Sequence, residues 1–269
     1  MSDEDRNPLA LASKVPAATA YFWIIKILTT GMGETTSDFL LHSVHPRAAA
    51  VLAVGLTFAA AVAVQIISRR YHAGRYWMVV VLVAVFGTMV ADVIDFIYHV
   101  PLGPSTAVFA ALVGAVLLAW WLTERTLSIH SIVSRRREGF YWATVFLTFV
   151  LGTAAGDLTA DTLELGFLGS GIVFLGMILV PLLAHRLLKV NEVLCFWVAY
   201  ILTRPLGASF ADWMSAPHSR NGLGLGPLKV SVIWASAIAA MVVWMAMRRS
   251  QELPTLESPG DAPGADLSS

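Results

Sequence analysis

The sequence predicts an all-α membrane protein with eight transmembrane helices, arranged as four parallel two-helix repeats in two pseudo-symmetric halves. Of its residues, 57% are hydrophobic and 13% charged, whereas soluble domains carry about 25% charged residues. Four times, a tryptophan is followed after ten residues by glycine and after fifteen by aspartate, within a long apolar run. The four sets are Trp23/Gly33/Asp38, Trp77/Gly87/Asp92, Trp142/Gly152/Asp157 and Trp197/Gly207/Asp212.

Eight segments are long and apolar enough for helices that cross the hydrocarbon core, which takes about 20 residues. They are 19–41, 47–67, 76–98, 104–123, 141–163, 169–188, 193–214 and 228–247. Pro181 and Pro205 fall inside two of these segments and should kink them, because proline removes a helical hydrogen bond. The tail over 250–269 is rich in Pro, Gly, Ser and acidic residues, which predicts disorder.

The distribution of basic residues predicts the orientation. Outside the predicted helices, thirteen Lys and Arg residues fall on the side that holds both termini, and three (Arg47, Arg220 and Lys229) fall on the other side. Basic loops favour the cytoplasm, so both termini should be cytoplasmic. The predicted domains are an N-terminal segment over 1–18, a transmembrane domain over 19–249 and the cytoplasmic tail.

Each repeat pairs a motif helix with a second helix that carries few polar residues. The repeats cover about 19–68, 73–124, 138–189 and 193–249. Because each unit crosses twice, all four share one orientation and an axis along the membrane normal. The repeated tryptophans should anchor the helices at the membrane interface. Each repeated glycine precedes another small residue by four positions, a spacing that lets two helices approach closely.

Polar residues gather around the repeated aspartates. A carboxylate is costly in a bilayer, and like charges in low dielectric must either hold protons or bind cations. The candidate metal- or proton-binding acids are Glu34, Asp38, Asp92, Asp95, Asp157, Asp161 and Asp212. The candidate supporting hydroxyls are Thr29, Thr88, Thr148, Thr153 and Thr203. Such hard oxygen ligands suit Mn²⁺, Mg²⁺ or Ca²⁺, and Zn²⁺ if a histidine joins.

Two basic residues lie inside predicted helices and are candidate charge partners for these acids. Lys26 either extends its amine to the cytoplasmic face or pairs with an acid. Arg204 is expected to pair with an aspartate; the alternatives are a tethered counter-ion that replaces a substrate cation, or a contact for an anionic substrate. The structural alternative for the aspartates is that Ser, Thr and backbone groups satisfy them and lock the bundle.

The tandem pattern resembles a bacterial membrane-protein family of four two-helix repeats, each with a characteristic tryptophan, catalogued as a repeat of unknown function. The stretches that carry the resemblance are YFWIIKILTTGMGETTSDF, RYWMVVVLVAVFGTMVAD, YWATVFLTFVLGTAAGDLTAD and FWVAYILTRPLGASFADW. The resemblance implies the four-repeat architecture and, through bacterial origin, the inner membrane. It implies no activity, so function must be argued from the residues.

The acids favour a secondary transporter or exporter of a divalent metal cation, Mn²⁺ foremost, with protons as the coupling ion. One alternative is a proton- or sodium-coupled carrier of a small organic solute, and another is a membrane scaffold. An enzyme is not expected, because Ala154 and Ala155 precede Gly156-Asp157, so Ala154 stands where an aspartyl protease needs the first glycine of Gly-x-Gly-Asp, and no HExxH or phosphate loop occurs. The expected partners are the bilayer, the cation and protons, with no nucleic acid and no organic cofactor. The oligomeric state does not follow from the sequence.

Overall fold

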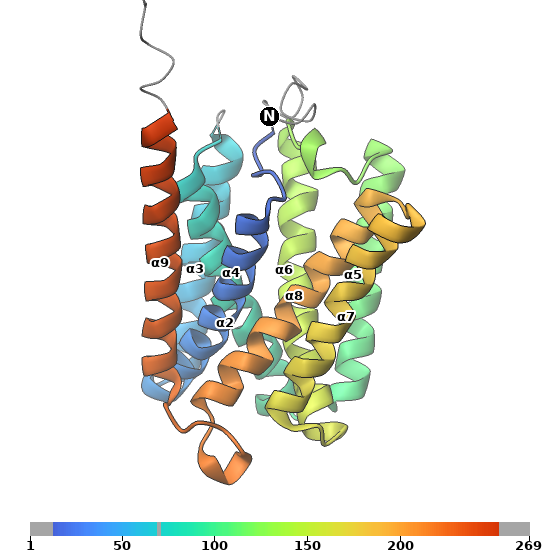
Figure 1. Ribbon diagram of the computed structural model, residues 1–269. Helices are drawn as coiled ribbons and strands as arrows, with labels where there is room; N and C mark the ends of the chain where they lie inside the picture. Colours follow the sequence, from blue (N-terminus) through green and yellow to red (C-terminus); the bar gives the residue numbers. More distant parts are fainter. Residues whose placement is uncertain (1–12, 69–70, 253–269) are drawn as a thin grey trace, which may run out of the picture.

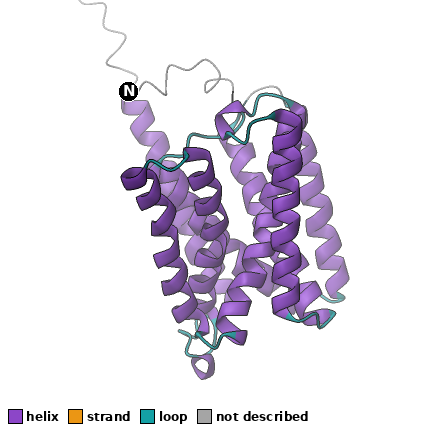
Figure 2. Ribbon diagram, turned by 90° about the vertical axis from the view of Figure 1, so that its right-hand side faces the viewer, coloured by secondary structure: helices purple, strands orange, loops and turns teal. Residues whose placement is uncertain are grey.

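The computed structural model describes residues 13–68 and 71–252. Within these ranges the chain forms eight long α-helices and no strand (Figure 2). The long helices are α2 (Ala20–Ser43), α3 (Arg47–Ile67), α4 (Ala73–Asp92), α5 (Leu102–Glu124), α6 (Arg135–Asp157), α7 (Gly166–Leu188), α8 (Glu192–Ser215) and α9 (Pro227–Glu252). Most of the predicted tail and of the predicted N-terminal segment lies outside the described residues, as do Arg6, Arg69 and Arg70 of the basic side, whereas the first residues of the tail continue α9 to Glu252.

Seven of the described helices are long and apolar enough to cross a membrane, which makes the chain a multi-pass membrane protein. The remaining helix, α2, has 24 residues but carries Lys26, Glu34 and Asp38 and falls short in apolarity. Its polar side chains are mostly buried within the protein. A helix surrounded by other helices need not be apolar, because its polar groups face protein rather than lipid.

The helix boundaries differ most from the predicted ones at α6, which begins at Arg135 rather than 141. The Ser134 side chain accepts a hydrogen bond from the Arg137 backbone N–H at 3.2 Å, which caps the first turn. The first turn of α6 is charged, so the apolar pattern alone placed the start of the helix too late. After Asp92 and Asp157, α4 and α6 continue as π-helical turns, η2 (Val93–Ile97) and η4 (Leu158–Thr162), which the sequence pattern did not predict.

The four motif helices α2, α4, α6 and α8 form a closed inner ring, in which each packs against the next and α8 packs against α2. The outer helices α3, α5, α7 and α9 pack mainly against α4, α6, α8 and α2, respectively. Figure 1 shows α2 and α8 tilted across the front of this bundle. The two halves expected from the sequence do not separate in this packing, because helices from different halves contact each other as extensively as those within one half.

The repeated glycines lie at the crossings of the ring. A Cβ added to any of them would collide with the residue that stands three positions before the glycine of the next inner helix. These pairs are Gly33 with Ala84, Gly87 with Phe149, Gly152 with Arg204, and Gly207 with Thr30. The same contact therefore recurs at all four crossings, and it requires a residue without a side chain.

The repeated tryptophans pack inside the bundle rather than outward as interface anchors. Trp142 and Trp197 are each 3% exposed, and Trp23 and Trp77 are partly buried against the same aromatic core. The Trp197 indole donates a hydrogen bond to the Leu127 carbonyl at 3.0 Å. Large rings fill the space between tilted helices at this end, so the tryptophans join the helices to one another.

The same end of the ring is closed by the segment that precedes α2 (Figure 1). Lys14 enters between the helices and forms a buried ion pair with Glu138 of α6 at 2.7 Å. Gln65 of α3 also donates to Glu138, at 3.2 Å, and the Ser13 hydroxyl donates to the Ile129 carbonyl at 2.9 Å. These polar contacts hold the segment before α2 against α3 and α6 at the end that carries the termini.

We predict that Gly33→Ala destabilises the protein, whereas Gly114→Ala does not. A Cβ at Gly33 would lie 2.9 Å from the Ala84 backbone carbonyl carbon, while one at Gly114 meets nothing within 4 Å. Overpacking a helix crossing costs about 1–3 kcal/mol. Thermal unfolding of both variants in detergent tests this expectation, and equal midpoints would contradict it.

Candidate functional site

Arg204 of α8 occupies the centre of the inner ring and is fully buried. Its Nη2 donates to Glu34 Oε2 of α2 and to Thr88 Oγ1 of α4. It also donates to Thr153 Oγ1 of α6, at 2.7 Å. One end of the guanidinium thus contacts all three other inner helices. We call Arg204, Glu34, Thr88 and Thr153 the central guanidinium site.

The repeat explains why these oxygens converge. Glu34, Thr88 and Thr153 each directly follow their repeated glycine, and Ala208 holds this position in α8. Three equivalent side chains therefore reach the ring centre at one level, and the small Ala208 leaves the fourth side to Arg204, one turn earlier. The pairing with Glu34 corrects the expected pairing with an aspartate, because the aspartates lie four residues further along their helices.

Part of the guanidinium lacks a hydrogen-bond partner. Arg204 Nε and Nη1 are buried and meet no acceptor among the described residues. The Cζ atom lies 5.5 Å from the centroid of the Phe149 ring, within the range of a cation–π contact. Arg204 is therefore held by one carboxylate, two hydroxyls and an aromatic ring.

The four repeated aspartates are half-buried and form the layer beyond the central guanidinium site. They do not make the predicted metal cluster, since no three His, Cys, Asp or Glu side chains within the described ranges are arranged to hold a metal ion. The Ser37 hydroxyl donates to Asp92 at 3.4 Å. Asp157 and Asp212 occupy the corresponding positions of α6 and α8.

Asp38 and Asp92 line a cavity of about 320 Å³ at the end of the bundle opposite the termini. His42, Arg47 and Arg220 line the same cavity. Its walls therefore carry both acidic and basic groups.

The two additional acids lie in the π-helical turns and have different environments. Asp95 is buried, at 6% exposure. Asp161 is exposed and pairs with Arg220 at 2.6 Å, so it belongs to the rim of the bundle. The seven predicted acids are thus divided among the centre, the aspartate layer and the rim.

Lys26 stays buried rather than extending to the end of the bundle, and it pairs with no acid of the described residues. Its amine is fully buried and has no hydrogen-bond partner among the residues described. It lies 4.2 Å from the ring centroids of both Phe149 and Tyr200. These two rings form a box around the amine, and Phe149 is the ring that Arg204 also contacts.

The predicted threonines fall into two groups. Thr29, Thr148 and Thr203 each donate to the carbonyl three residues earlier, at 2.8, 2.7 and 2.7 Å. Thr88 and Thr153 also donate within their own helices, at 3.0 and 3.2 Å, but they accept from Arg204 as well. Only these last two join the site.

Sequence reasoning missed the aromatic groups around the two buried cations. Phe149 stands at the same repeat position as Arg204, three residues before its glycine. Tyr76 and Tyr141 share a hydrogen bond between their hydroxyls at 2.6 Å. Aromatic residues do recur eleven positions before each glycine (Phe22, Tyr76, Tyr141 and Phe196), but Phe149 and Tyr200 do not belong to that set, so no repeated pattern marked them.

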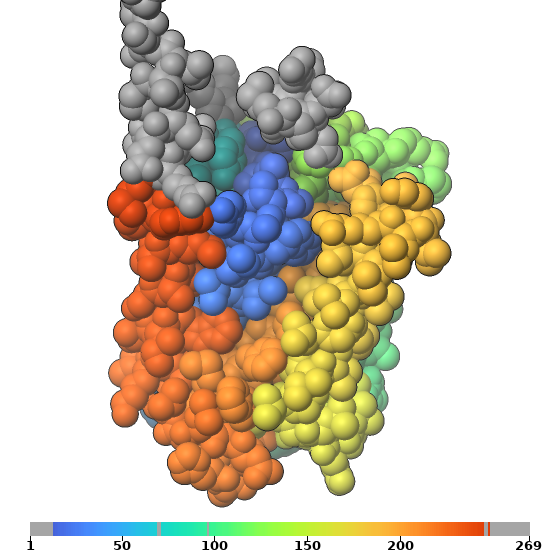
Figure 3. Space-filling model, viewed as in Figure 1, coloured from blue at the N-terminus to red at the C-terminus, as the bar shows by residue number. Residues whose placement is uncertain are grey.

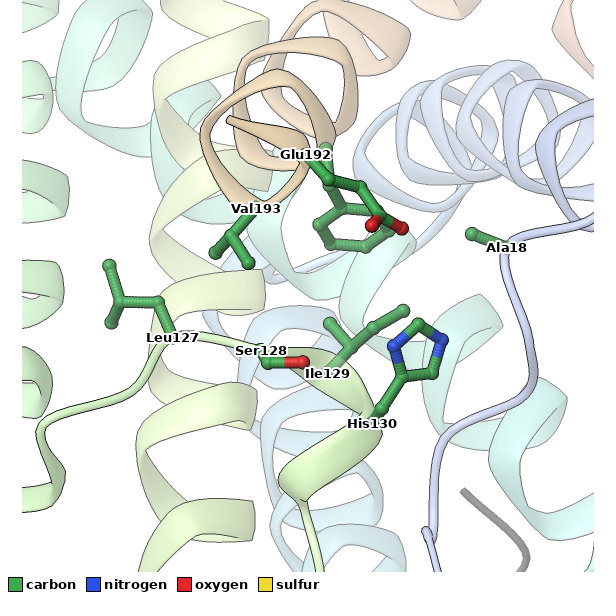
Figure 4. A pocket seen from close by; sticks show the side chains of 8 residues that line it. Ala18, Leu127, Ser128, Ile129, His130, Glu192 and Val193 are labelled. Carbon is green, nitrogen blue, oxygen red and sulfur yellow. The ribbon is translucent and has the colours of Figure 1, made fainter. Parts of the chain in front are cut away.

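Further hollows lie near the termini, and two of them adjoin α2 or the segment before it. A pocket of about 50 Å³ is lined by His130, Glu192 and the start of α8 (Figure 4), and it has room only for water. A mainly apolar groove of about 400 Å³ lies between Trp23 of α2 and the residues around Pro181 of α7, on the face in Figure 3 where α2 lies between α9 and α8. Neither hollow reaches the central guanidinium site.

The fold and the site define a multi-pass helical membrane protein that encloses buried charges within a ring of repeated helices. The chain belongs to the family described as Repeat of Unknown Function (DUF347), which matches residues 21–71, 75–126, 140–190 and 195–251. The resemblance seen in the sequence is thereby confirmed. Neither a curated protein nor a solved structure matches the chain significantly.

We predict that Arg204→Met and Glu34→Met each destabilise the protein strongly, and that the double variant recovers much of the loss. Breaking a buried ion pair costs about 3–5 kcal/mol, whereas replacing both partners by apolar groups is often neutral. A double-mutant cycle on unfolding in detergent measures the coupling. Additive effects of the two substitutions would show that the pair is not the source of stability.

Lys26→Met should stabilise the protein by about 1–3 kcal/mol, because it removes a buried amine that lacks a hydrogen-bond acceptor. Methionine keeps most of the side-chain volume. Lys26→Ala serves as the comparison, since it removes the amine but leaves a cavity. A lower unfolding midpoint for Lys26→Met than for the wild type would mean that the aromatic contacts outweigh the cost of burial.

Proposed function

We propose that this protein is a secondary transporter of a cation, with the central guanidinium site as the binding position. The observation that carries the proposal is a guanidinium that occupies oxygens from three helices at the ring centre. In this mechanism Arg204 is a tethered counter-ion, which holds Glu34 while the site is empty and leaves when a substrate cation arrives. By ligand type, the oxygens suit a divalent metal ion such as Mn²⁺; by charge, the single carboxylate in contact with Arg204 suits a monovalent cation.

The charge layers support a path for cations. The repeated aspartates lie four residues beyond the central oxygens, about 6 Å along the helix axes. Asp38 and Asp92 also line the cavity at the open end. A cation entering there would meet carboxylates first and Glu34 next. Acids that do not bind the cation would carry the coupling protons.

We further propose the membrane setting. α2 crosses the bilayer inside the bundle, which brings the number of crossings to eight, and the repeats are related around the ring rather than as two halves. The recurrence of one glycine contact at all four crossings supports this relation. The basic residues near Lys14 favour a cytoplasmic location for that end, so the cavity faces outward from a bacterial inner membrane.

A carrier of a small organic solute, driven by protons or sodium, is the second candidate. The cavity of about 320 Å³ favours it, because Asp38 and Asp92 face Arg47 and Arg220 across a space larger than a bare ion needs. Arg204 would then contact a carboxylate of the solute. This candidate differs from the first in that metal ions alone would not bind.

We expect one cation from a panel of Mn²⁺, Mg²⁺, Ca²⁺, Zn²⁺ and Na⁺ to raise the unfolding midpoint of the detergent-purified protein selectively. A ligand at 100 times its dissociation constant adds about 2.7 kcal/mol. Glu34→Gln should abolish the shift, because it removes the carboxylate of the binding position, and Asp92→Asn and Asp157→Asn should weaken it, because they remove carboxylates from the entry path. Glu192→Gln, which changes an exposed acid near the termini, should retain it.

The same ion should exchange across the membrane of liposomes that contain the protein. A flat response to every ion, with a shift only for organic solutes, would favour the second candidate. If no ligand changes the unfolding midpoint and both aspartate variants fail to fold, the scaffold interpretation is the one that remains.

A further inference from the structure

The geometry points to a small monovalent organic cation with a guanidinium group as the substrate of the central guanidinium site. This inference rests on the proposed cation transport and narrows its substrate class. It concerns the ligand that exchanges with Arg204 at Glu34, Thr88 and Thr153.

The charge balance of the site favours a monovalent ligand. Among the described residues that contact Arg204, Glu34 is the only carboxylate, so the site neutralises a single positive charge. A divalent ion would leave one charge unbalanced in a low-dielectric interior. The displaced Arg204 keeps its charge with either ligand, because guanidinium groups do not lose their proton, so a monovalent ligand leaves the smaller excess of positive charge. Ca²⁺ takes about six to eight oxygen ligands, more than Glu34, Thr88 and Thr153 supply.

The hydrogen bonds of the site favour a ligand with several N–H donors. Arg204 Nη2 donates to one carboxylate and two hydroxyls that come from three different helices. Thr153 donates its proton to the Phe149 carbonyl, and Thr88 donates its proton to the Ala84 carbonyl or to Glu34 Oε2. Each hydroxyl can therefore accept a hydrogen bond from a donor at the centre. The site therefore offers acceptors to N–H donors, and a planar guanidinium presents several donors at fixed positions.

The aromatic rings around the site favour an organic cation. Phe149 lies beside the guanidinium of Arg204, and Phe149 and Tyr200 enclose the amine of Lys26 at 4.2 Å. Aromatic faces attract organic cations, whereas a metal ion requires oxygen or nitrogen ligands. Both buried cationic positions of the ring centre thus have the chemistry of organic-cation recognition, and both are filled by the protein's own side chains.

A cavity beside the aspartate layer is large enough to admit a small organic cation. The cavity beside the aspartate layer has about 320 Å³, within the size range of pockets for small molecules. Asp38 and Asp92 in its wall would attract the substrate. The same aspartate layer would receive the guanidinium of Arg204 after its displacement from Glu34, because it lies one turn away.

The experiment uses the full-length protein in detergent with methylguanidinium as the probe and Mn²⁺ and tetramethylammonium as comparators. Methylguanidinium should raise the unfolding midpoint saturably, and tetramethylammonium should not, since it has no N–H donors. Thr153→Val should weaken methylguanidinium binding about tenfold or more, the effect of losing a hydrogen bond to a charged group. Thr57→Val is the matched control, because Thr57 is exposed on α3 and donates to Ala53 within its own helix; it should bind as the wild type does.

Labelled methylguanidinium should also exchange across liposomes that contain the wild-type protein. Binding of Mn²⁺ without binding of methylguanidinium would overturn this inference and leave cation transport standing. Equal affinity of Thr153→Val and Thr57→Val would overturn the site assignment. No response to any cation, in binding or exchange, would overturn both the inference and the proposed function.

Discussion

The ion pair between Arg204 and Glu34 is the interaction on which the rest of the structure depends. A guanidinium deep in a helical bundle of a membrane protein needs a counter-charge and acceptors, and Glu34, Thr88 and Thr153 supply them from three helices. Those helices must approach closely for the short threonine side chains to reach the centre. The glycines at the four crossings allow this approach, so the packing of the ring and its central charge depend on each other.

The ring combines a repeated backbone arrangement with a chemistry that differs in every repeat. The glycine contacts recur at all four crossings, and an aspartate follows each glycine at the same distance. At the centre, however, the positions after the glycines carry Glu34, Thr88, Thr153 and Ala208. A single asymmetric site results, which suits one bound cation better than the four equivalent ligands of a channel filter.

The two ends of the ring are unlike each other. At the end with the termini, the ion pair of Lys14 and Glu138 and a layer of aromatic rings close the interior. At the other end, half-buried aspartates border a cavity. The pair of Arg204 with Glu34 and the end that carries the termini would both have to rearrange for a cation to pass through the centre. The buried Lys26 lies between the aromatic layer and Arg204, so such a rearrangement would change its contacts with the aromatic rings.

The sequence by itself determined the membrane class, most helix positions and the repeats, because apolar length and the spacing of Trp, Gly and Asp are local properties. It also determined which polar residues lie within the helices. Only the tertiary structure decided that Arg204 pairs with Glu34, that Lys26 lies between aromatic rings and that no three acids of the described residues are arranged to hold a metal ion. Those outcomes depend on how each helix is rotated and which helices are neighbours, and several rotations satisfy the same apolar pattern. The tryptophans illustrate the limit, since aromatic residues near a helix end can face lipid or a neighbouring helix, and the packing of the ring turned them inward.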